Sequence, residues 1–515
     1  MISLSTLTSD FNLELTQSGS SDVFKKMTID SRRVNDETLF VACPGATRHS
    51  HDGHSFLGAA IQAGATGVVI SPDYSEPLPK HVTVLRSSHL RRSAAQIAEY
   101  IVGCPTDDMN LIGITGTNGK TTVSFLVATL LEHLGERAAV FGTLGVGRPG
   151  QLKELGYTTP EAEVLSEECV YLNQQSNPYV ALEVSSHALA LSRVDGIRLK
   201  TAVFTNFSRD HLDYHLDMSS YFDAKARLFY ELVDVDGLAI IPSDFSSVGY
   251  ELVPEKIRCK RILTWGTDER ANVRGENIQS RDTKTTFTVA YGGEQFPVET
   301  TLLGEHNIHN LLVAAAVAIG FGHSLEDVAE ALSHARSAPG RFERVESNGA
   351  GARPLAIIDF AHTPDALANV LKVCRDLVKG HVWVVFGCGG DRDKGKRVEM
   401  GRVAAQYADV VILTNDNPRS EEPAAILKEI EHGVKGGGKL LWREGHETVN
   451  AYHSIEDREE AIGFAIRHAN VEDLVLIAGK GHESTITIGD QKFSFVDAEI
   501  ASGFLSQWEG AHVFS

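Results

Sequence analysis

The chain has no long apolar run of the kind that crosses a membrane. Its 515 residues contain no stretch of about 20 consecutive apolar residues, and the longest run, LLVAAAVAIGFG from Leu311, predicts a buried helix. The N-terminal MISLSTLTSDFNLELT lacks a basic start and a continuous apolar core. We therefore expect no secretory signal and a cytoplasmic location.

Paired cysteines and an excess of basic residues are also missing. The six cysteines are scattered without a C-x-x-C pair, which favours reduced thiols over a disulfide framework or a zinc site. Asp plus Glu number 68 against 48 Lys plus Arg, a net charge of −20 that argues against sequence-independent nucleic-acid binding. Any anionic ligand must therefore be held by local loops and arginines.

Two polar stretches rich in Pro or Gly divide the chain. GCPTDDMN at 103–110 and SNGAGARP at 347–354 predict three domains, 1–108, 109–346 and 347–515. In the third domain, apolar runs such as VWVVF and VVILT end in polar loops and lead into helical patterns, which predicts an α/β fold with a parallel sheet. Those loops are expected at the carboxyl ends of the strands, where such sheets bind ligands. In the middle domain, TTFTVAYGGEQFPVET predicts a hairpin turning at Gly292 and Gly293.

The stretch GITGTNGKTT, Gly113 to Thr122, has the composition of a phosphate loop between a strand and a helix. Backbone amides in such a turn cradle anionic oxygens, with Lys120 reaching terminal phosphates and Thr121 a magnesium ion. The strict pattern requires glycine at position 114, which is Ile114, so the loop is a variant and an ordinary turn is the alternative. The predicted nucleotide-binding residues here are Gly116, Thr117, Asn118, Gly119, Lys120, Thr121 and Thr122. Glu183, at the end of the apolar run YVAL, is the candidate acidic magnesium ligand, with a solvated strand end as the alternative.

Eight blocks together resemble the Mur ligases of peptidoglycan synthesis. In chain order they are GTNGKTT, EVSSHAL, FTNFSRDHLDYH, GEHNIHN, PGRFERV, DFAHTPDAL, FGCGGDRDKGKR and DNPR, within a region from Gly113 to Glu483. The resemblance implies an N-terminal domain for the UDP end of a substrate, a central P-loop ATPase and a C-terminal Rossmann-like domain for an amino acid. It implies that ATP phosphorylates a carboxylate of UDP-N-acetylmuramoyl-L-Ala-D-Glu. The amine of meso-diaminopimelate then attacks the acyl phosphate.

The resemblance also implies roles for residues that look ordinary by themselves. Glu183, His211 and Lys225, the last as a carbamate, would lie around magnesium, and Lys120, His211 and Lys225 would be the catalytic residues. From sequence alone, we expect Lys225 to be an ordinary lysine on a surface helix and His211 to be a hydrogen-bonded histidine in a loop. The implied nucleotide contacts are Asn307, Asn310, Arg341, Asp359 and His362. A helix cap is the alternative for each asparagine, and an exposed salt bridge between domains is the alternative for Arg341.

Two further groups of contacts follow from the same resemblance. For the UDP-sugar dipeptide they are Ser31, Thr158, Thr159, Ser185 and Arg193, whereas the family has glutamine where this chain has Leu191. For diaminopimelate they are Arg392, Asp416, Asn417, Pro418, Arg419, Gly479 and Glu483. Without the family, the loop NDNPRSEEP reads as a turn leading into a helix, with Ser420 as a possible cap.

Three other functions are compatible with a phosphate loop. A folylpolyglutamate synthetase would share the ATPase core but bind folate in place of a UDP-sugar. A switch NTPase would use hydrolysis for conformational change, and would leave DNPR and GKGHE without a purpose. A catalytically dead scaffold is disfavoured by the intact Lys120, Thr121, Glu183, His211 and Lys225. We expect a monomer with Mg²⁺ as cofactor, ATP as co-substrate and no nucleic-acid partner.

Overall fold

The computed structural model describes residues 1–45, 51–212, 214–244, 249–281, 284–347, 351–442 and 449–510. Residues 348–350 of the second predicted linker lie outside this description. The chain forms two compact units, which are described separately. The first comprises Met1–Ile278, Thr286–Glu299 and His306–Ala335, and the second comprises Gln279–Thr285, Thr300–Glu305 and Arg336–Ser515. The predicted boundary at residue 108 falls inside the first unit and stays a prediction.

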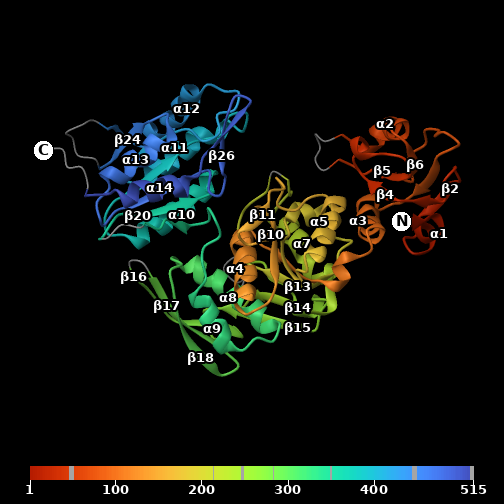
Figure 1. The fold of residues 1–515 in the computed structure, drawn as a ribbon, viewed down its shortest axis with the longest axis horizontal. Coiled ribbons are helices and arrows are strands. Elements are labelled where there is room, and N and C mark those ends of the chain that lie inside the picture. The colour runs from red at the N-terminus through yellow and green to blue at the C-terminus, as the bar shows by residue number, and fades with distance from the viewer. Residues whose placement is uncertain are drawn as a thin grey trace. The chain divides into compact units, whose positions relative to one another are not determined.

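The first unit begins with a five-stranded sheet in the order β2-β7-β6-β5-β4, parallel except at β2 (Figure 1). Alternate residues of its strands face opposite sides, so Val41 packs in the core that includes α3, while Phe40 packs in the core that includes α2. β1 and β3 form a separate two-stranded antiparallel sheet. The elements are β1 (Ile2–Ser3), α1 (Leu4–Ser9), β2 (Glu14–Gln17), β3 (Val23–Phe24), β4 (Lys26–Thr28), β5 (Thr38–Val41), α2 (Leu57–Gln62), β6 (Ala65–Ile70), β7 (Thr83–Arg86) and α3 (Leu90–Ile101).

An eleven-stranded sheet follows, in the order β11-β10-β9-β12-β8-β13-β14-β15-β16-β17-β18. Its strands from β9 to β16 are parallel, and β8 is buried on both faces between β12 and β13, as its apolar sequence predicts. The strands are β8 (Asn110–Thr115), β9 (Ala138–Gly142), β10 (Gly145–Arg148), β11 (Gln151–Lys153), β12 (Tyr179–Glu183), β13 (Leu199–Phe204), β14 (Val233–Pro242), β15 (Arg261–Gly266), β16 (Val273–Arg281), β17 (Lys284–Tyr291) and β18 (Glu294–Thr300).

Both local predictions for this region are confirmed. Gly292 and Gly293 join β17 to β18 with φ values of 61° and 90°, as a tight hairpin turn with two left-handed positions requires. The apolar run from Leu311 is the buried part of α8. Among the described residues, no helix is long and apolar enough to cross a membrane. The helices are α4 (Lys120–His133), α5 (Ala162–Gln174), α6 (Ser186–Ala190), α7 (Met218–Arg227), α8 (Glu305–Gly320) and α9 (Leu325–Ser333).

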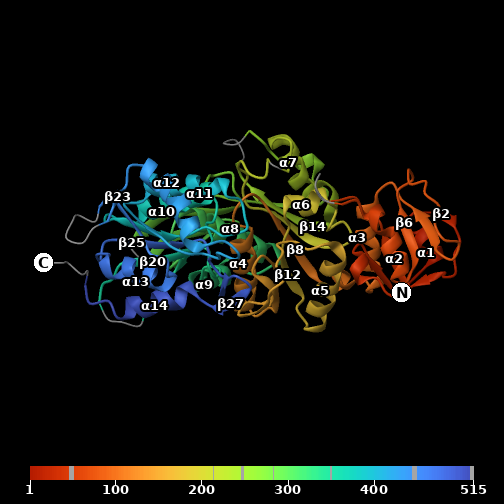
Figure 2. The same ribbon diagram turned by 90° about the horizontal axis from the view of Figure 1, so that it is seen from above.

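The second unit is the predicted parallel sheet covered by helices, in the order β19-β20-β25-β21-β22-β24-β23 with only β19 antiparallel. Figure 2 shows α10, α11 and α12 on one face of the sheet and α13 and α14 on the other. Val384 of β21 faces the first group, and its neighbour Trp383 faces the second. The elements are β19 (Glu343–Arg344), β20 (Leu355–Asp359), α10 (Pro364–Leu377), β21 (Val382–Phe386), α11 (Gly395–Tyr407), β22 (Val410–Leu413), α12 (Pro423–Gly436), β23 (Leu440–Leu441), β24 (Ala451–Ser454), α13 (Arg458–His468), β25 (Leu474–Ala478), β26 (Thr485–Ile488), β27 (Gln491–Ser494) and α14 (Asp497–Ser506).

Candidate active site

The predicted phosphate loop connects the central strand β8 to α4. Gly116 and Gly119 have φ values of +146° and +83°, which side-chain-bearing residues rarely adopt. A Cβ at Gly116 would overlap Thr205 Oγ1, and one at Gly119 would lie 2.8 Å from Asn310 Oδ1. The loop therefore requires glycine at both positions. It is followed at once by Lys120 and the N-terminal turn of α4, the arrangement that binds anionic oxygens.

The segment after β13 holds the shape of this loop. Asn206 O accepts the Thr117 amide at 2.9 Å, and Asn206 Oδ1 accepts the Asn118 amide at 2.9 Å. Thr205 Oγ1 donates to Asn118 O at 2.6 Å. Sequence reasoning missed Thr205 and Asn206, although both lie in the block FTNFSRDHLDYH, because their partners are about ninety residues earlier in the chain.

Two lysines converge on one carbonyl of the loop. Lys120 Nζ donates to Gly116 O at 3.0 Å and to Thr117 O at 2.8 Å, and Lys225 Nζ donates to Gly116 O at 2.7 Å. Lys225 is 1% exposed, so the sequence-based interpretation of a surface-helix lysine is wrong. Its burial, reinforced by the positive charge of Lys120, lowers the pKa of the Lys225 amine well below its usual value. Its Nζ also lies 4.5 Å from the centre of the Tyr221 ring.

Glu183 is buried beside Thr121, which excludes the alternative of a solvated strand end. Its carboxylate accepts the Thr121 hydroxyl at 2.9 Å and both the amide and the hydroxyl of Thr143, at 2.9 and 3.1 Å. A Cβ at Gly142 would overlap this carboxylate, so glycine makes room for it. Carboxylate and hydroxyl oxygens are the ligands that Mg²⁺ prefers. Within the described part of the chain, no three His, Cys, Asp or Glu side chains gather as a metal site, so Mg²⁺ here would need oxygens from phosphates or water.

The other predicted residues of the first unit's nucleotide site lie on α8 and after β13. Asn307 and Asn310 are buried, and Asn310 Nδ2 donates to Asn307 Oδ1 at 3.3 Å. Because α8 begins at Glu305, both lie within the helix, so neither is its N-cap. His211 has a φ of +52°, and its Nε2 lies 3.6 Å from Asp210 Oδ2.

Four of the five predicted UDP-substrate residues lie together near Glu183. Thr159 Oγ1 donates to Glu183 O at 2.8 Å and accepts the Ser185 amide at 3.1 Å. Arg193 donates to Thr159 O at 2.9 Å, and the Thr158 hydroxyl lies 3.0 Å from that of Thr143. The fifth residue, Ser31, starts a short 3-10 turn in the N-terminal sheet region. Leu191 is buried and lines a small cavity that Arg193 also lines.

A cavity of about 590 Å³ lies beside these residues and was not predicted. The loops after β5, β6 and β7 contribute Pro44, Ser71 and Ser87, so it sits at the carboxyl ends of the parallel strands. Its lining includes three arginines, Arg91 and Arg92 from α3 and Arg227 from α7. Each is paired with a carboxylate, Arg91 with Glu161 and the other two with Asp195 and Glu231. The clustered Arg91-Arg92 pair at the start of a helix was the available sequence signal.

In the second unit, the loop after β22 carries the predicted amino-acid contacts. Arg419 is half-buried with a φ of +51°, its guanidinium donates to Gly390 O at 2.7 Å, and its amide donates to Thr487 O at 3.1 Å. A Cβ at Gly390 would overlap Pro418 O, so the glycines after β21 fit closely against this loop. Ser420 bonds to Asp391 at 2.6 Å and does not cap α12, which begins at Pro423. Arg392 is exposed on the neighbouring loop.

Asp416 and Asn417 meet Gly479 and Glu483 in the same place. Asn417 Nδ2 donates to Glu483 Oε2 at 2.8 Å and to Asp416 Oδ1 at 3.1 Å. Burial raises the pKa of the Asp416 carboxyl, an effect opposed by nearby cations. Lys480 is fully buried and donates to Glu483 Oε2 at 3.0 Å and to Thr485 O at 2.6 Å. Sequence patterns predict no role for Lys480 of GKGHE, because its burial is not visible in the sequence.

Arg341, Asp359 and His362 gather at the end of β20 around Phe360. The guanidinium of Arg341 lies 4.9 Å from the Phe360 ring centre, and His362 Nδ1 lies 2.8 Å from Phe360 O. Asp359 accepts the amides of Phe342 and Ala361, each at 2.8 Å. Burial raises the pKa of the Asp359 carboxyl and lowers that of the His362 imidazole.

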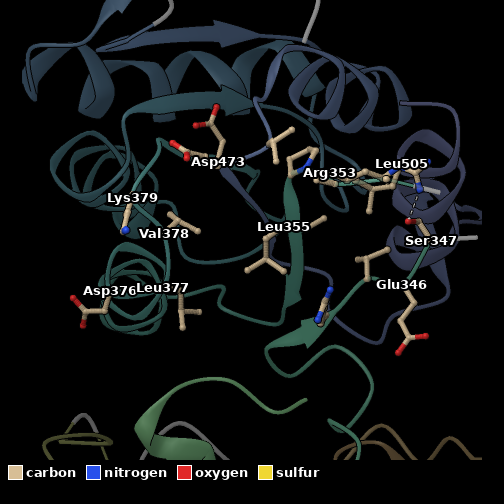
Figure 3. Close-up of a pocket in the computed structure, with 18 residues that line it drawn as sticks. Glu346, Ser347, Arg353, Leu355, Asp376, Leu377, Val378, Lys379, Asp473 and Leu505 are labelled. Carbon is tan, nitrogen blue, oxygen red and sulfur yellow. Dashed lines mark hydrogen bonds between the residues drawn. The ribbon is translucent and has the colours of Figure 1, made fainter. Parts of the chain in front are cut away.

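Figure 3 shows a second cavity, of about 1050 Å³, in the same unit. Leu355 at the start of β20 and Asp473 just before β25 line it, so it lies at the amino ends of the strands, opposite the predicted loops. Arg353 donates to Ser347 Oγ at 3.0 Å there. Its lining residues include none of the predicted site residues.

These features define an α/β protein with a phosphate loop on one parallel sheet and a polar ligand site on another. Residues 114–318 match the Mur ligase middle domain, and residues 340–481 match the Mur ligase, glutamate ligase domain. The chain belongs to the Mur ligase family, whose members are ATP-dependent ligases.

Individual relatives are similar to this protein over most of the length of the chain. It is similar to the UDP-N-acetylmuramoyl-L-alanyl-D-glutamate--2,6-diaminopimelate ligases of Bacillus velezensis, at 38% identity over 92% of each chain, and of Geobacter sulfurreducens, at 40% identity over 92% of each. A solved structure of a ligase with the same name is 30% identical, covers 98% of this chain and 99% of its own, and has a TM-score of 0.67. A folylpolyglutamate synthase from Mycobacterium tuberculosis, 19% identical with a TM-score of 0.57 over 76% of this chain and 92% of its own, shares the fold alone.

Proposed function

We propose that this protein joins meso-2,6-diaminopimelate to UDP-N-acetylmuramoyl-L-Ala-D-Glu at the expense of ATP. A carboxylate oxygen of the dipeptide attacks the terminal phosphorus of ATP, and ADP leaves. The amine of diaminopimelate then attacks the carbonyl carbon of the acyl phosphate, and an amide, inorganic phosphate and a proton result. The observation that carries the proposal is the packing of two loops at one sheet edge, where Asn417 bonds to Glu483 and Thr487 bonds to both Asn417 and Arg419. This arrangement offers both a cation and acceptors to an amino acid.

The first unit would hold the triphosphate. The loop amides and the first turn of α4 receive its oxygens, and Lys120 turns from Gly116 O and Thr117 O to the transferred phosphate. Thr121 and Glu183 would hold Mg²⁺, which when bound neutralises phosphate charge. Asn310, packed against Gly119, fixes the loop from the side of α8.

Lys225 would act as a carbamate formed when its unprotonated amine adds to carbon dioxide and releases a proton. Lys225 is 1% exposed and lies beside the cationic Lys120, where an ammonium is costly to keep. A carbamate reverses the sign of this position and offers two oxygens toward the metal. His211 would also lie near the metal, as the family resemblance implies.

The UDP-sugar dipeptide would occupy the cavity lined by Arg91, Arg92 and Arg227, with Thr159, Ser185 and Arg193 nearer the reacting carboxylate. Its diphosphate suits guanidinium groups, which pair oxygens in a planar fork. Ser31 and Thr158 are proposed contacts on the same grounds. At the amino-acid end, Arg419 and Arg392 would pair the distal carboxylate of diaminopimelate, while Asp416, Asn417, Pro418, Gly479 and Glu483 surround the distal ammonium.

The direct test is ATP-dependent phosphate release by the purified protein. We expect release only when UDP-N-acetylmuramoyl-L-Ala-D-Glu and meso-diaminopimelate are both present. Reactions with L-lysine, or with a reduced folate plus glutamate, serve as specificity controls. Release with folate and glutamate would favour the folylpolyglutamate alternative, and release without any acceptor would favour a switch NTPase.

A further inference from the structure

Arg458, the first residue of α13, is a fully buried arginine outside the predicted site. Its guanidinium donates to both carboxylate oxygens of Asp497, at 2.8 and 2.7 Å. Its two remaining contacts are backbone carbonyls, Asn415 O at 3.1 Å and Ala478 O at 3.1 Å. The first carbonyl immediately precedes Asp416 of the amino-acid loop, and the second immediately precedes Gly479.

These two loops are joined away from their strands, where Asn417 bonds to Glu483 and the Arg419 backbone forms a bridge with Ile488. They follow β22 and β25, and β21 lies between those strands in the sheet. The chain after β22 crosses the end of β21 at Gly387, where a Cβ would overlap Thr414 O and lie 3.0 Å from Asp416 N. Across this gap, Asp416 Oδ2 is 3.5 Å from the position of a Cβ on Gly479. At the point where the two loops leave their strands, Arg458 therefore bonds to the backbone of both, at Asn415 O and Ala478 O.

The segment before α13 completes the anchor. Glu456 O accepts the Asn415 amide at 3.4 Å and the Thr414 hydroxyl at 3.3 Å. Both backbone groups of Asn415 are thus bonded to residues 456–458, and the guanidinium of Arg458 also bonds to Ala478 O at the start of the loop after β25.

We propose that Arg458 is a positioning residue for amino-acid selection, which sets the distance between the loop containing Asp416 to Arg419 and the loop containing Gly479 to Glu483. The inference rests on the proposed function of these loops. Lysine at position 458 keeps the charge opposite Asp497, but a single ammonium lacks the planar fork that reaches two carbonyls and a carboxylate. A displacement of about 1 Å in such a loop can lower the reaction rate of the bound amino acid roughly a hundredfold.

The experiment compares the wild type with Arg458→Lys in steady-state phosphate release. We expect KM for meso-diaminopimelate to rise by roughly 10- to 100-fold and its preference over L-lysine to fall, with KM for ATP and for the UDP-substrate unchanged. A second variant, Arg458→Met with Asp497→Leu, removes both buried charges together and so avoids leaving one unpaired. Ile466→Ala, in the buried core on the same helix, is the control for loss of stability alone.

Each outcome decides the inference. A folded Arg458→Lys protein with unchanged KM for diaminopimelate and unchanged selectivity overturns it. An equal rise in KM for diaminopimelate in the Ile466→Ala control also overturns the inference. Failure of both Arg458 variants to fold overturns it as well. Either result would make the role of Arg458 purely structural. If only Arg458→Lys fails to fold, KM for diaminopimelate and the preference over L-lysine are measured in the double variant, and the same outcomes apply. A wild type that releases no phosphate with diaminopimelate instead overturns the proposed function.

Discussion

The most specific prediction concerns Arg419 and the choice between diaminopimelate and lysine. Diaminopimelate carries a distal carboxylate that L-lysine lacks. The guanidinium of Arg419 is oriented by its bond to Gly390 O, and the backbone is fixed by Thr487 O and by the Gly489 amide, which donates to Arg419 O at 2.7 Å. The side chain therefore stands ready to pair a carboxylate with little loss of conformational freedom.

The size of the preference for diaminopimelate follows from the free-energy cost of leaving the Arg419 guanidinium without a carboxylate. When lysine binds, Arg419 is covered but receives no carboxylate, and such an unmet contact costs about 3 to 4 kcal/mol. At about 1.4 kcal/mol per tenfold change, the preference for diaminopimelate should be roughly 140- to 720-fold. Arg419→Ala should lose most of this preference, and Arg419→Lys, which keeps the charge without the fork, should lie between the two.

The assay is kcat/KM for each amino acid at saturating ATP and UDP-substrate, in the wild type and the three variants Arg419→Ala, Arg419→Lys and Arg402→Ala. Arg402 is an exposed arginine of α11 paired with Glu399, and its removal should leave the ratio unchanged. Full selectivity in Arg419→Ala, or equal turnover of lysine and diaminopimelate by the wild type, would refute this account of the loop.

Three other changes test the ATP end of the site. Lys120→Ala should abolish ligation with thermal unfolding nearly unchanged, since the lysine compensates charge on the transferred phosphate; near-normal turnover would contradict the ATPase assignment. Gly142→Ala should displace the Glu183 carboxylate and lower activity at limiting Mg²⁺ at least tenfold; an unchanged Mg²⁺ titration would argue against Glu183 as a ligand. Lys225→Ala should be nearly inactive and partly rescued by a small carboxylate; intact mass showing unmodified Lys225 in fully active enzyme would remove the carbamate.

The elements that sequence patterns predicted well are those whose signals are local. The hairpin at Gly292 and Gly293, the turn into α4 and the parallel sheet of the second unit all follow from neighbouring residues and from period-2 or helical spacing. The burial of α8 follows equally directly from its apolar run.

The parts that the sequence did not predict depend on distant contacts. Lys225, Lys480 and Arg458 are charged residues on helices or loops that read as exposed, and only the folded chain shows them buried. For Arg458 a signal was present, since it lies on the helical face of the buried Ala461 and Ile462. The brace of Thr205 and Asn206 on the phosphate loop joins segments about ninety residues apart, which no local pattern encodes.

The most direct test of the proposed ligation is a competition reaction analysed by mass spectrometry. The wild-type protein is given ATP, Mg²⁺ and UDP-N-acetylmuramoyl-L-Ala-D-Glu with equal amounts of meso-diaminopimelate and L-lysine. The proposed function predicts one nucleotide-sugar product, with the mass of the diaminopimelate amide, formed in equal amount with ADP. A lysine amide as the main product, or ADP formed without any amide, would contradict it.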